Sequence, residues 1–247
     1  MKRRIAIAGM GAWGQALAHV AKAAGHEVGM WSRKHSDVAS FASYDAIILA
    51  VPAQAVRGVL NVIKPPKDIP LIISAKGIEQ QSAKFMNEVV TEIVPGARVY
   101  VLSGPSFASD VLKAMPTAVT LAAPTLAEAG EWAQALSLPM FRIYGSDDVL
   151  GVEIGGALKN VLAIACGIAD GRGLGDSARA ALTTRLCRVD ALWEKIGGKA
   201  RNPYRACRPW RSLAHLFQPP ITHLFLWSGY WAGGFRWRGA GCLAGCC

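Results

Sequence analysis

Three glycines near the start of the chain are spaced in a way that suits a phosphorylated ligand. Gly9, Gly11 and Gly14 follow the apolar run Ile5–Ala8 and lead directly into a helix-forming stretch. In a strand–turn–helix unit the first glycine permits the tight turn, the second lets backbone approach a pyrophosphate, and the third lets the helix pack closely on the strand. The helix N-terminus adds free N–H groups and a partial positive charge. This context predicts a dinucleotide site rather than a simple turn.

Two basic residues follow the second predicted strand, where a dinucleotide-binding domain contacts the cofactor ribose. The strand ends at Trp31 and Ser32, and Arg33 and Lys34 follow without a carboxylate. An acidic residue here would bind the ribose 2′-hydroxyl, whereas a basic one accommodates a 2′-phosphate. The pair therefore favours NADP, or the use of both NADP and NAD. A solvated basic turn is the alternative.

Two lysines stand among apolar residues. Lys76 directly follows a predicted buried strand, and Lys159 lies within an apolar helical stretch. Such a lysine must extend to solvent, form a pair or take part in chemistry. A desolvated ammonium can donate a proton to a carbonyl oxygen, or polarise it, during reduction. Another predicted strand is followed by the turn Ser103–Ala108, whose N–H and hydroxyl donors suit a phosphate or a hydroxyl. An ordinary Gly-Pro turn that binds nothing is the alternative.

Short apolar runs alternate with helical stretches over residues 1–145, which predicts an α/β domain. Continuous apolar strands between amphipathic helices indicate a doubly wound, Rossmann-like parallel sheet that is covered on both faces. Ligands of such a sheet bind beyond the carboxyl ends of the strands. The expected strands are Ile5–Ala8, Glu27–Trp31, Ala46–Val51, Leu71–Ser74, Val99–Leu102, Ala118–Ala122 and Phe141–Ile143, and the expected helices are Gly11–Ala24, Gln54–Ile63, Ala83–Ile93 and Thr125–Leu136.

A long helix from Val149 to about Asp170 changes the pattern and predicts the start of a helical substrate domain. Its four glycines are unfavourable in a helix and indicate close approach of a neighbouring backbone or a ligand. We expect a second helix from about Ser177. The chain thus divides into a dinucleotide-binding domain (1–145), the opening of an incomplete all-helical catalytic domain (146–185) and an aberrant tail (186–247).

The composition describes a folded protein, with 52% hydrophobic and 18% charged residues. The net charge of +10 would allow nucleic-acid binding. However, the basic residues form no patch at motif spacing, and a phosphorylated cofactor and metabolite explain the balance equally well, so we expect no nucleic-acid partner. The six cysteines include no CxxC pair and have no histidines at zinc-site spacing, which predicts reduced thiols and no metal.

No membrane segment is expected. A predicted strand begins within the first eight residues, which does not fit a signal peptide. The apolar stretch Val149–Ala169 carries Glu153 and Lys159, and residues 224–234 are too few to cross a bilayer. We expect a soluble, cytoplasmic protein, with a homodimer as an open alternative to a monomer.

Five segments together resemble bacterial NAD(P)-dependent glycerol-3-phosphate dehydrogenase over residues 1–185. They are GMGAWGQALA, SAKGIE, LSGPSFASDV, PTAVTLA and GVEIGGALKNVLAIACGIADGRGLGDSARAALTTR. The resemblance implies reversible reduction of dihydroxyacetone phosphate to sn-glycerol 3-phosphate with NAD or NADP, a step in glycerophospholipid biosynthesis. It makes Lys159 the catalytic proton donor and acceptor. It implies cofactor contacts at Gly9, Gly11, Ala12, Trp13, Gly14, Arg33, Lys34, Lys76 and Ala108, and substrate contacts at Lys76, Gly104, Ser106 and Lys159.

The chain departs from this family at three places. Ala12 stands where the family usually has serine, and the connection between Arg33 and Ala46 is shorter than in many members. After Arg185 the family's AGLGDL…TC…SRN pattern is missing. Codons can be chosen for Asn202–Phe225 so that reading one base later gives TLIGPAGLGDLWLTCSSPQSRIF. This indicates a reading-frame error or a decayed gene, with a divergent domain as the alternative.

Two other functions stay open from the sequence. One is another two-domain dehydrogenase, of the hydroxyacid or 6-phosphogluconate type, which would need a different catalytic-helix sequence from GGALKN. The other is an NADP-binding remnant without turnover, because the missing pattern carries residues that complete the site in the resembling family.

A tail of non-native sequence would leave the apolar face of the long helix uncovered, and large uncovered patches are rare in monomers. We therefore predict that the 247-residue product is poorly soluble and that limited proteolysis cuts it after Arg185, leaving the N-terminal domain. Mass spectrometry of the fragments checks this. A soluble, protease-resistant chain with normal turnover would show instead that residues 186–247 form a divergent domain.

Overall fold

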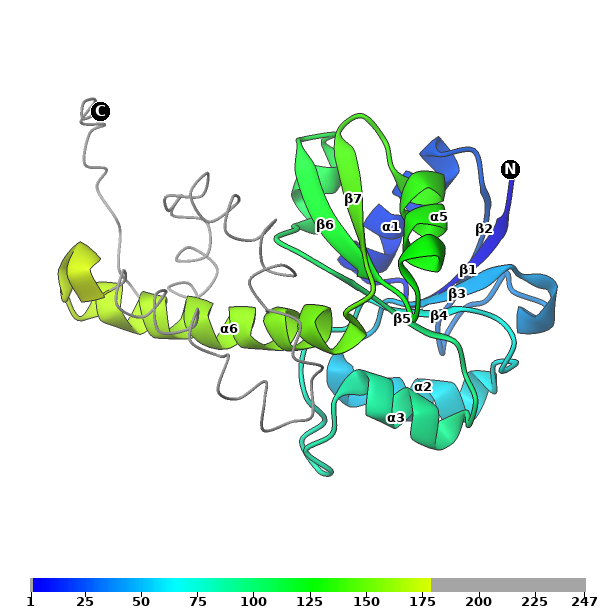
Figure 1. The fold of residues 1–247 in the computed structure, drawn as a ribbon, viewed down its shortest axis with the longest axis horizontal. Helices are drawn as coiled ribbons and strands as arrows, with labels where there is room; N and C mark the ends of the chain where they lie inside the picture. Colours follow the sequence, from blue (N-terminus) through cyan, green and yellow to red (C-terminus); the bar gives the residue numbers. More distant parts are fainter. Residues whose placement is uncertain (1, 179–247) are drawn as a thin grey trace.

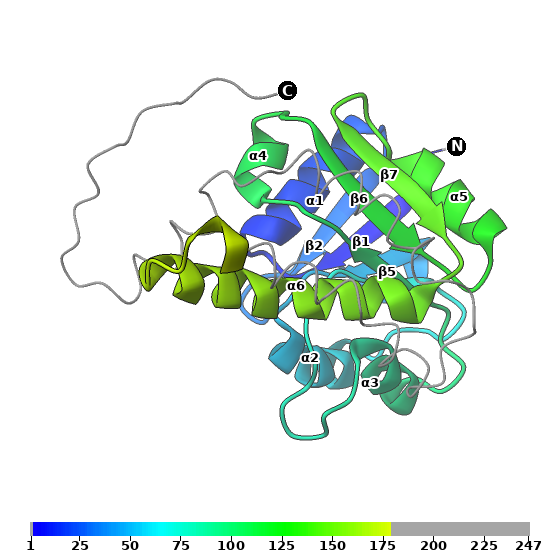
Figure 2. The ribbon, with the colours of Figure 1, turned by 60° about the vertical axis from the view of Figure 1, so that its left-hand side comes forward.

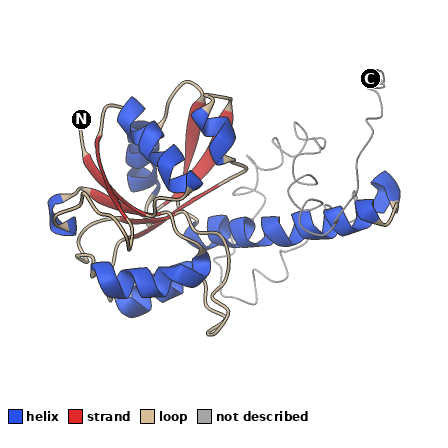
Figure 3. Ribbon diagram, turned by 180° about the vertical axis from the view of Figure 1, so that it is seen from behind, coloured by secondary structure: helices blue, strands red, loops and turns tan. Residues whose placement is uncertain are grey.

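The computed structural model describes residues 2–178, and the predicted tail 186–247 lies outside the described residues. Figures 1 and 3 show one layered α/β unit from which a single long helix extends. The strands are β1 (Arg4–Ala8), β2 (Glu27–Trp31), β3 (Ala46–Leu49), β4 (Leu71–Ile73), β5 (Val99–Ser103), β6 (Thr117–Ala122) and β7 (Phe141–Ser146). The helices are α1 (Ala12–Ala23), α2 (Val56–Ile63), α3 (Met86–Ile93), α4 (Ala108–Leu112), α5 (Leu126–Leu136) and α6 (Val149–Gly171), with short 3-10 turns η1 (Phe41–Ser43) and η2 (Ala53–Ala55).

The seven strands form one sheet in the order β2-β1-β3-β4-β5-β6-β7. The chain leaves β1 toward β2 on one side and toward β3 on the other, which is the reversal that defines a doubly wound sheet. The predicted Rossmann-like fold is therefore confirmed, and the glycine loop lies at this reversal.

The expectation of an entirely parallel sheet is wrong at one pair, because β6 runs antiparallel to β5. A parallel return needs a crossover that carries the chain back along the whole strand. The connection from β5 to β6 (residues 104–116) contains α4, a helix of only five residues, and no helix that returns along the sheet. The chain turns back at the carboxyl end of β5 instead of crossing over, and β7 then pairs parallel to β6.

Alternate strand residues supply two separate cores. Ile5 and Ile7 face the cluster built by α1, α4 and α5, whereas Ala6 and Ala8 face the cluster built by α2 and α3. Figure 1 shows these helix groups on opposite sides of the sheet. Because both faces are covered, the strands read as continuous apolar runs, and nearly every residue of β1, β3 and β4 is buried.

Two helices begin two or three residues later than expected. The stretch predicted as Gln54–Ile63 starts with η2 and becomes α-helical only at Val56. The stretch predicted from Ala83 becomes helical at Met86, because Ala83 has a φ of +55° and its N–H bonds to the carbonyl of Glu79 in a preceding turn. The short helix α4 was not predicted.

The glycine loop is fixed by close backbone contacts. Gly9 has a φ of +128°, and a Cβ placed there would lie 2.2 Å from the carbonyl oxygen of Ala50. A Cβ on Gly14 would lie 2.0 Å from the carbonyl oxygen of Gly9, so only glycine lets α1 start this close to β1. A Cβ on Gly11 would meet nothing within 4 Å, which leaves that side of the loop open.

Helix α6 crosses the carboxyl ends of the central strands and then runs beyond the sheet, as Figure 2 shows. Val152, Ile154 and Ala157 in its first half are buried, whereas Val161 and Ile168 in its second half are 60% and 48% exposed. By length and hydropathy alone, α6 is the one described helix that could cross a membrane. Residues 175–178 are helical again, slightly before the predicted start at Ser177.

The glycine loop yields a matched pair of variants. We predict that Gly14→Ala lowers the free energy of unfolding by about 2–3 kcal/mol or more, because its Cβ would overlap backbone rather than a movable side chain. Gly11→Ala should change it by about 1 kcal/mol or less, since its φ of −70° suits alanine and its surroundings are open. Denaturant unfolding of both variants measures this. Equal destabilisation would show that the close approach at Gly14 does not matter.

Candidate active site at the carboxyl ends of the strands

The glycine loop has the features that a dinucleotide needs. Its Gly9 N–H donates to the carbonyl of Trp31 at 2.8 Å, which holds the loop beside the end of β2. Gly11 is the N-cap residue of α1 and supplies no side-chain acceptor, so the first N–H groups of the helix stay available to an anion. Ala12 is exposed at the first position of α1, and the half-buried Trp13 packs against the core beneath. The open side of the loop therefore fits a pyrophosphate.

The predicted basic pair lies at the tip of a tight turn after β2. Ser32 closes this turn, because its N–H donates to the carbonyl of His35 at 2.7 Å and its hydroxyl accepts from the His35 N–H at 3.1 Å. Asp37 then accepts from the Met30 N–H on the strand. Arg33 and Lys34 are exposed. The turn holds both cations beside the glycine loop, where the ribose of a dinucleotide would lie.

Lys76 follows β4 and reaches across to the end of β5. Its Nζ donates to the carbonyl of Gly104 at 2.8 Å. Burial, together with the nearby charge of Lys159, lowers the pKa of Lys76 to about 8. An ammonium has three donors, so the bond to Gly104 leaves two for a ligand.

Lys159 lies on α6, the helix that follows the last strand of the sheet. Its Nζ lies 5.5 Å from the ring centroid of Phe107, which follows the Gly-Pro turn. Burial lowers the pKa of Lys159 to about 8. One turn earlier, a Cβ on Gly156 would lie 2.4 Å from the Ser103 hydroxyl and 3.6 Å from Cγ of Lys76. The glycine therefore lets α6 approach β5 closely enough to place both lysines in one region.

The two lysines make this region electropositive and ready for proton transfer. Neither forms an ion pair with any acidic residue among those at 2–178. Two half-buried cations near each other favour an anionic ligand, which would relieve their repulsion. Groups with pKa values near 8 exchange protons readily at neutral pH, as acid–base catalysis requires.

The remaining predicted residues lie around the same strand ends. Gly104 is buried against Val119 of β6, and the Ser106 hydroxyl lies 3.4 Å from the Gly104 carbonyl. Ala108 is the first residue of α4 and packs against the core cluster that also carries Trp13. The fold thus brings together the turn after β5, Lys76 and Lys159, and places Arg33 and Lys34 at the end of β2.

The structure makes two residues conspicuous: Ser103, which the sequence placed only at the start of a turn with hydroxyl donors, and Glu153, to which it gave no role. The Ser103 hydroxyl is buried and has no hydrogen-bond partner within the described part of the chain. Glu153 is only 3% exposed and lies on the same helix as Lys159. A charge within an apolar helix is the signal that singles out Glu153 in the sequence, but by itself it argues only against a membrane span.

A surface hollow of about 370 Å³ beside α2 contains neither lysine. Its only cation, Arg57, is held by Glu79 and Glu92 at 2.8 Å each, so the hollow offers no free positive charge to an anion. Over residues 2–178, no three His, Cys, Asp or Glu side chains gather in a way that could hold a metal ion. Among residues 2–178, the lysine region is therefore the candidate active site.

Two family models match this chain. The N-terminal model of NAD-dependent glycerol-3-phosphate dehydrogenase matches residues 4–44 and 34–129, and the C-terminal model of the same enzyme matches residues 148–207. The chain belongs to the NAD-dependent glycerol-3-phosphate dehydrogenase family. The N-terminal match divides in the connection between Arg33 and Ala46, which is the segment predicted to be short.

Relatives and solved structures agree with this assignment. Glycerol-3-phosphate dehydrogenase [NAD(P)+] of Methylobacterium radiotolerans is 48% identical over 73% of this chain and 64% of its own length. The enzyme of that name from Parvibaculum lavamentivorans is 44% identical over 74% and 64%. A crystal structure of glycerol-3-phosphate dehydrogenase from Coxiella burnetii has a TM-score of 0.73 and 33% identity, covering 81% of this chain and 71% of its own. The chain thus spans slightly less than two thirds of the curated relatives.

The turn after β2 predicts the choice of cofactor. A charged contact to a 2′-phosphate contributes about 1.5–3 kcal/mol, or roughly 10- to 100-fold in affinity, when it is well formed. We expect the chain to bind NADPH at least as tightly as NADH, and Arg33→Ala to weaken NADPH by that factor while sparing NADH. Titration calorimetry measures both, with Lys22→Ala on α1 as a control for loss of positive charge. Equal losses for NADPH and NADH would show that Arg33 does not contact the phosphate.

Proposed function

We propose that the site of this chain serves the reversible reduction of dihydroxyacetone phosphate to sn-glycerol 3-phosphate with NADPH or NADH, and that turnover needs the family's sequence after Arg185. The observation that supports this proposal most directly is that Lys76 and Lys159 converge at the strand ends, beside a glycine loop that fits a dinucleotide. Both lysines have pKa values near 8. Family membership narrows this general dehydrogenase geometry to one reaction. The missing AGLGDL…TC…SRN pattern after Arg185 makes the chain's own activity the point to test.

The glycine loop, the open N-terminus of α1 and the Arg33–Lys34 turn would hold the dinucleotide. Trp13, Lys76 and Ala108 would make further contacts to the cofactor. When bound, the reduced nicotinamide supplies the hydride that the carbonyl carbon of the substrate takes up. The protein must then hold the substrate, exclude water and deliver one proton.

Lys159 would supply that proton. In its charged form it donates a hydrogen bond to the substrate carbonyl oxygen, and it transfers the proton as that oxygen becomes an alkoxide. In the reverse direction the neutral amine takes the hydroxyl proton from glycerol 3-phosphate. Its contact with Phe107 shields one side of the ammonium and strengthens its electrostatic effect on the reacting oxygen.

Lys76 and the turn after β5 would orient the substrate. Lys76 is fixed by the Gly104 carbonyl and keeps two donors, and the Ser106 hydroxyl lies beside the same carbonyl. These donors suit the hydroxyl and phosphate oxygens of a small phosphorylated ketone. Holding such a substrate in one geometry contributes to rate through orientation.

The lowered pKa values give the two directions opposite pH dependence. Reduction needs protonated Lys159, so its rate should fall as pH rises through about 8, and oxidation should rise over the same interval. Lys76 also loses its charge near pH 8. It then binds the substrate phosphate less tightly, so the rate of reduction falls further as the pH rises.

Two alternatives and the cellular context belong to the same proposal. A cofactor-binding remnant without turnover would follow from the family's AGLGDL…TC…SRN pattern that is missing after Arg185. A hydroxyacid or 6-phosphogluconate dehydrogenase has no observation in its favour beyond the shared fold. We further propose a cytoplasmic protein that works without nucleic acid or a membrane span, as a monomer or a homodimer.

The test follows NADPH absorbance with dihydroxyacetone phosphate, in the chain as it stands and in a version with the family's sequence restored after Arg185. We expect little or no turnover in the former and clear turnover in the latter. There Lys159→Ala should lower turnover about 100-fold or more while leaving cofactor affinity nearly intact. Cofactor binding without turnover in both versions would favour the remnant. Near-normal turnover of the variant would remove Lys159 from the mechanism.

A further inference from the structure

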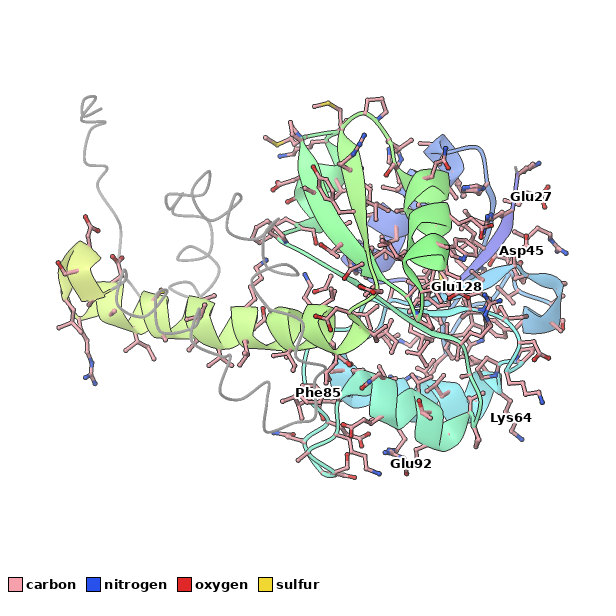
Figure 4. The ribbon with its side chains drawn as sticks, viewed as in Figure 1. Glu27, Asp45, Lys64, Phe85, Glu92 and Glu128 are labelled. Atoms are coloured by element: carbon pink, nitrogen blue, oxygen red, sulfur yellow. The ribbon has the colours of Figure 1, made fainter. Side chains whose placement is uncertain are left out.

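The buried carboxyl of Glu153 joins the helix that carries Lys159 to the start of another helix. Its Oε1 accepts from the N–H of Asn87 at 3.0 Å, and the Met86 N–H also interacts with it. Met86 and Asn87 are the first two residues of α3, whose N–H groups have no acceptor within the helix. In Figure 4, Phe85 marks this end of α3 beneath the first half of α6, and Glu92 lies toward the opposite end.

We infer that Glu153 is a positioning residue, which orients α6 through the N-terminus of α3 so that Lys159 is held in its half-buried site. This inference rests on the proposed role of Lys159, although the contact itself does not depend on it. Glu153, Gly156 and Lys159 are spaced by three residues, and each meets a different part of the sheet domain: α3, Ser103 and Phe107. Lys159 lies only about 9 Å along the helix from Glu153.

Stability alone does not explain the buried carboxyl of Glu153. Its Oε2 is buried without a partner in the described structure, and the group is desolvated. A well-packed apolar side chain commonly stabilises a protein as well as a buried polar group does, whereas a directional bond fixes orientation. The bond from Asn87 sets the rotation of α6 about its axis, which a purely apolar contact would leave looser.

The ionisation of Glu153 does not decide the contact. Burial raises the pKa of its carboxyl to about 7, so both forms are present near neutral pH. Either form offers an oxygen to the Asn87 N–H, and so does the amide of glutamine. The conservative variant Glu153→Gln should therefore retain the position of α6, whereas Glu153→Ala removes the acceptor.

Glu88 provides a matched control within the same helix end. Its carboxylate accepts from the Phe85 N–H at 2.7 Å, so it also caps α3, but this bond is local to α3 and does not reach α6. If Glu153 only stabilised α3, Glu88→Ala would reproduce its loss. If Glu153 orients α6, only substitutions of Glu153 should reach Lys159.

The experiment measures the pH dependence of acylation of Lys159 in the full 247-residue chain. Mass spectrometry of peptides gives the pH at which labelling is half-maximal, which is independent of how accessible the lysine is. We expect a midpoint near 8 in the wild type, Glu153→Gln and Glu88→Ala. In Glu153→Ala it should rise by one pH unit or more, a tenfold change in proton affinity, because a displaced α6 exposes the ammonium to water.

Glu153→Asp keeps the inference testable where the alanine variant does not fold. Its shorter side chain withdraws the carboxyl from Asn87, so the midpoint should rise in the same direction by a smaller amount. Circular dichroism confirms folding, and labelling of Lys22 on α1 should not differ among the variants. An unchanged midpoint in the folded Glu153 variants, failure of glutamine to preserve it, or an equal rise in Glu88→Ala would each overturn the inference. The labelling needs neither cofactor nor substrate, so absence of turnover in the version restored after Arg185 would count against the proposed function alone.

Discussion

The close approach of α6 to the end of β5 is the contact on which the candidate site depends. At Gly156 the helix comes so near to Ser103 that a single added carbon would lie 2.4 Å from the hydroxyl. The same approach brings Lys159 over Phe107 and beside Lys76. Without it, Lys159 would stand in solvent on a helix that leaves the sheet, and the pKa of Lys76 would be lowered less. One glycine therefore links the packing of a helix to the chemistry of two lysines.

This contact also explains why the site lies at the edge of the core rather than inside it. The two apolar clusters of the sheet fix the strand ends rigidly, because nearly every residue of the central strands is buried. The lysines stand where these clusters end, so each is partly desolvated without being sealed from a ligand. Complete burial would hold a lysine neutral, and full exposure would leave its pKa too high for proton exchange near neutral pH.

The sequence predicted the parts of the site that depend on local chemistry. The spacing of Gly9, Gly11 and Gly14 is a local property of one turn, and a lysine directly after a buried strand must reach the shared edge of a parallel sheet. Close approach at the glycines of α6 is confirmed at Gly156, whereas a Cβ at Gly155 or Gly167 would meet nothing within 4 Å among the described residues. The sequence shows that glycines are unusual within this helix, but only the packed structure shows which glycine lies against another part of the chain.

What the sequence could not predict depends on partners that are far apart in the chain. The reversal of β6 depends on how the connection after β5 folds, and the sequence pattern did not reveal it because the one helix in that connection, α4, is only five residues long. Glu153 bonds to Asn87, 66 residues away, and no local pattern joins a charge in an apolar helix to the first turn of another helix. Both cases have the same physical origin. A backbone N–H or a strand edge needs a partner, and where the local sequence supplies none, the tertiary fold determines which distant group provides it.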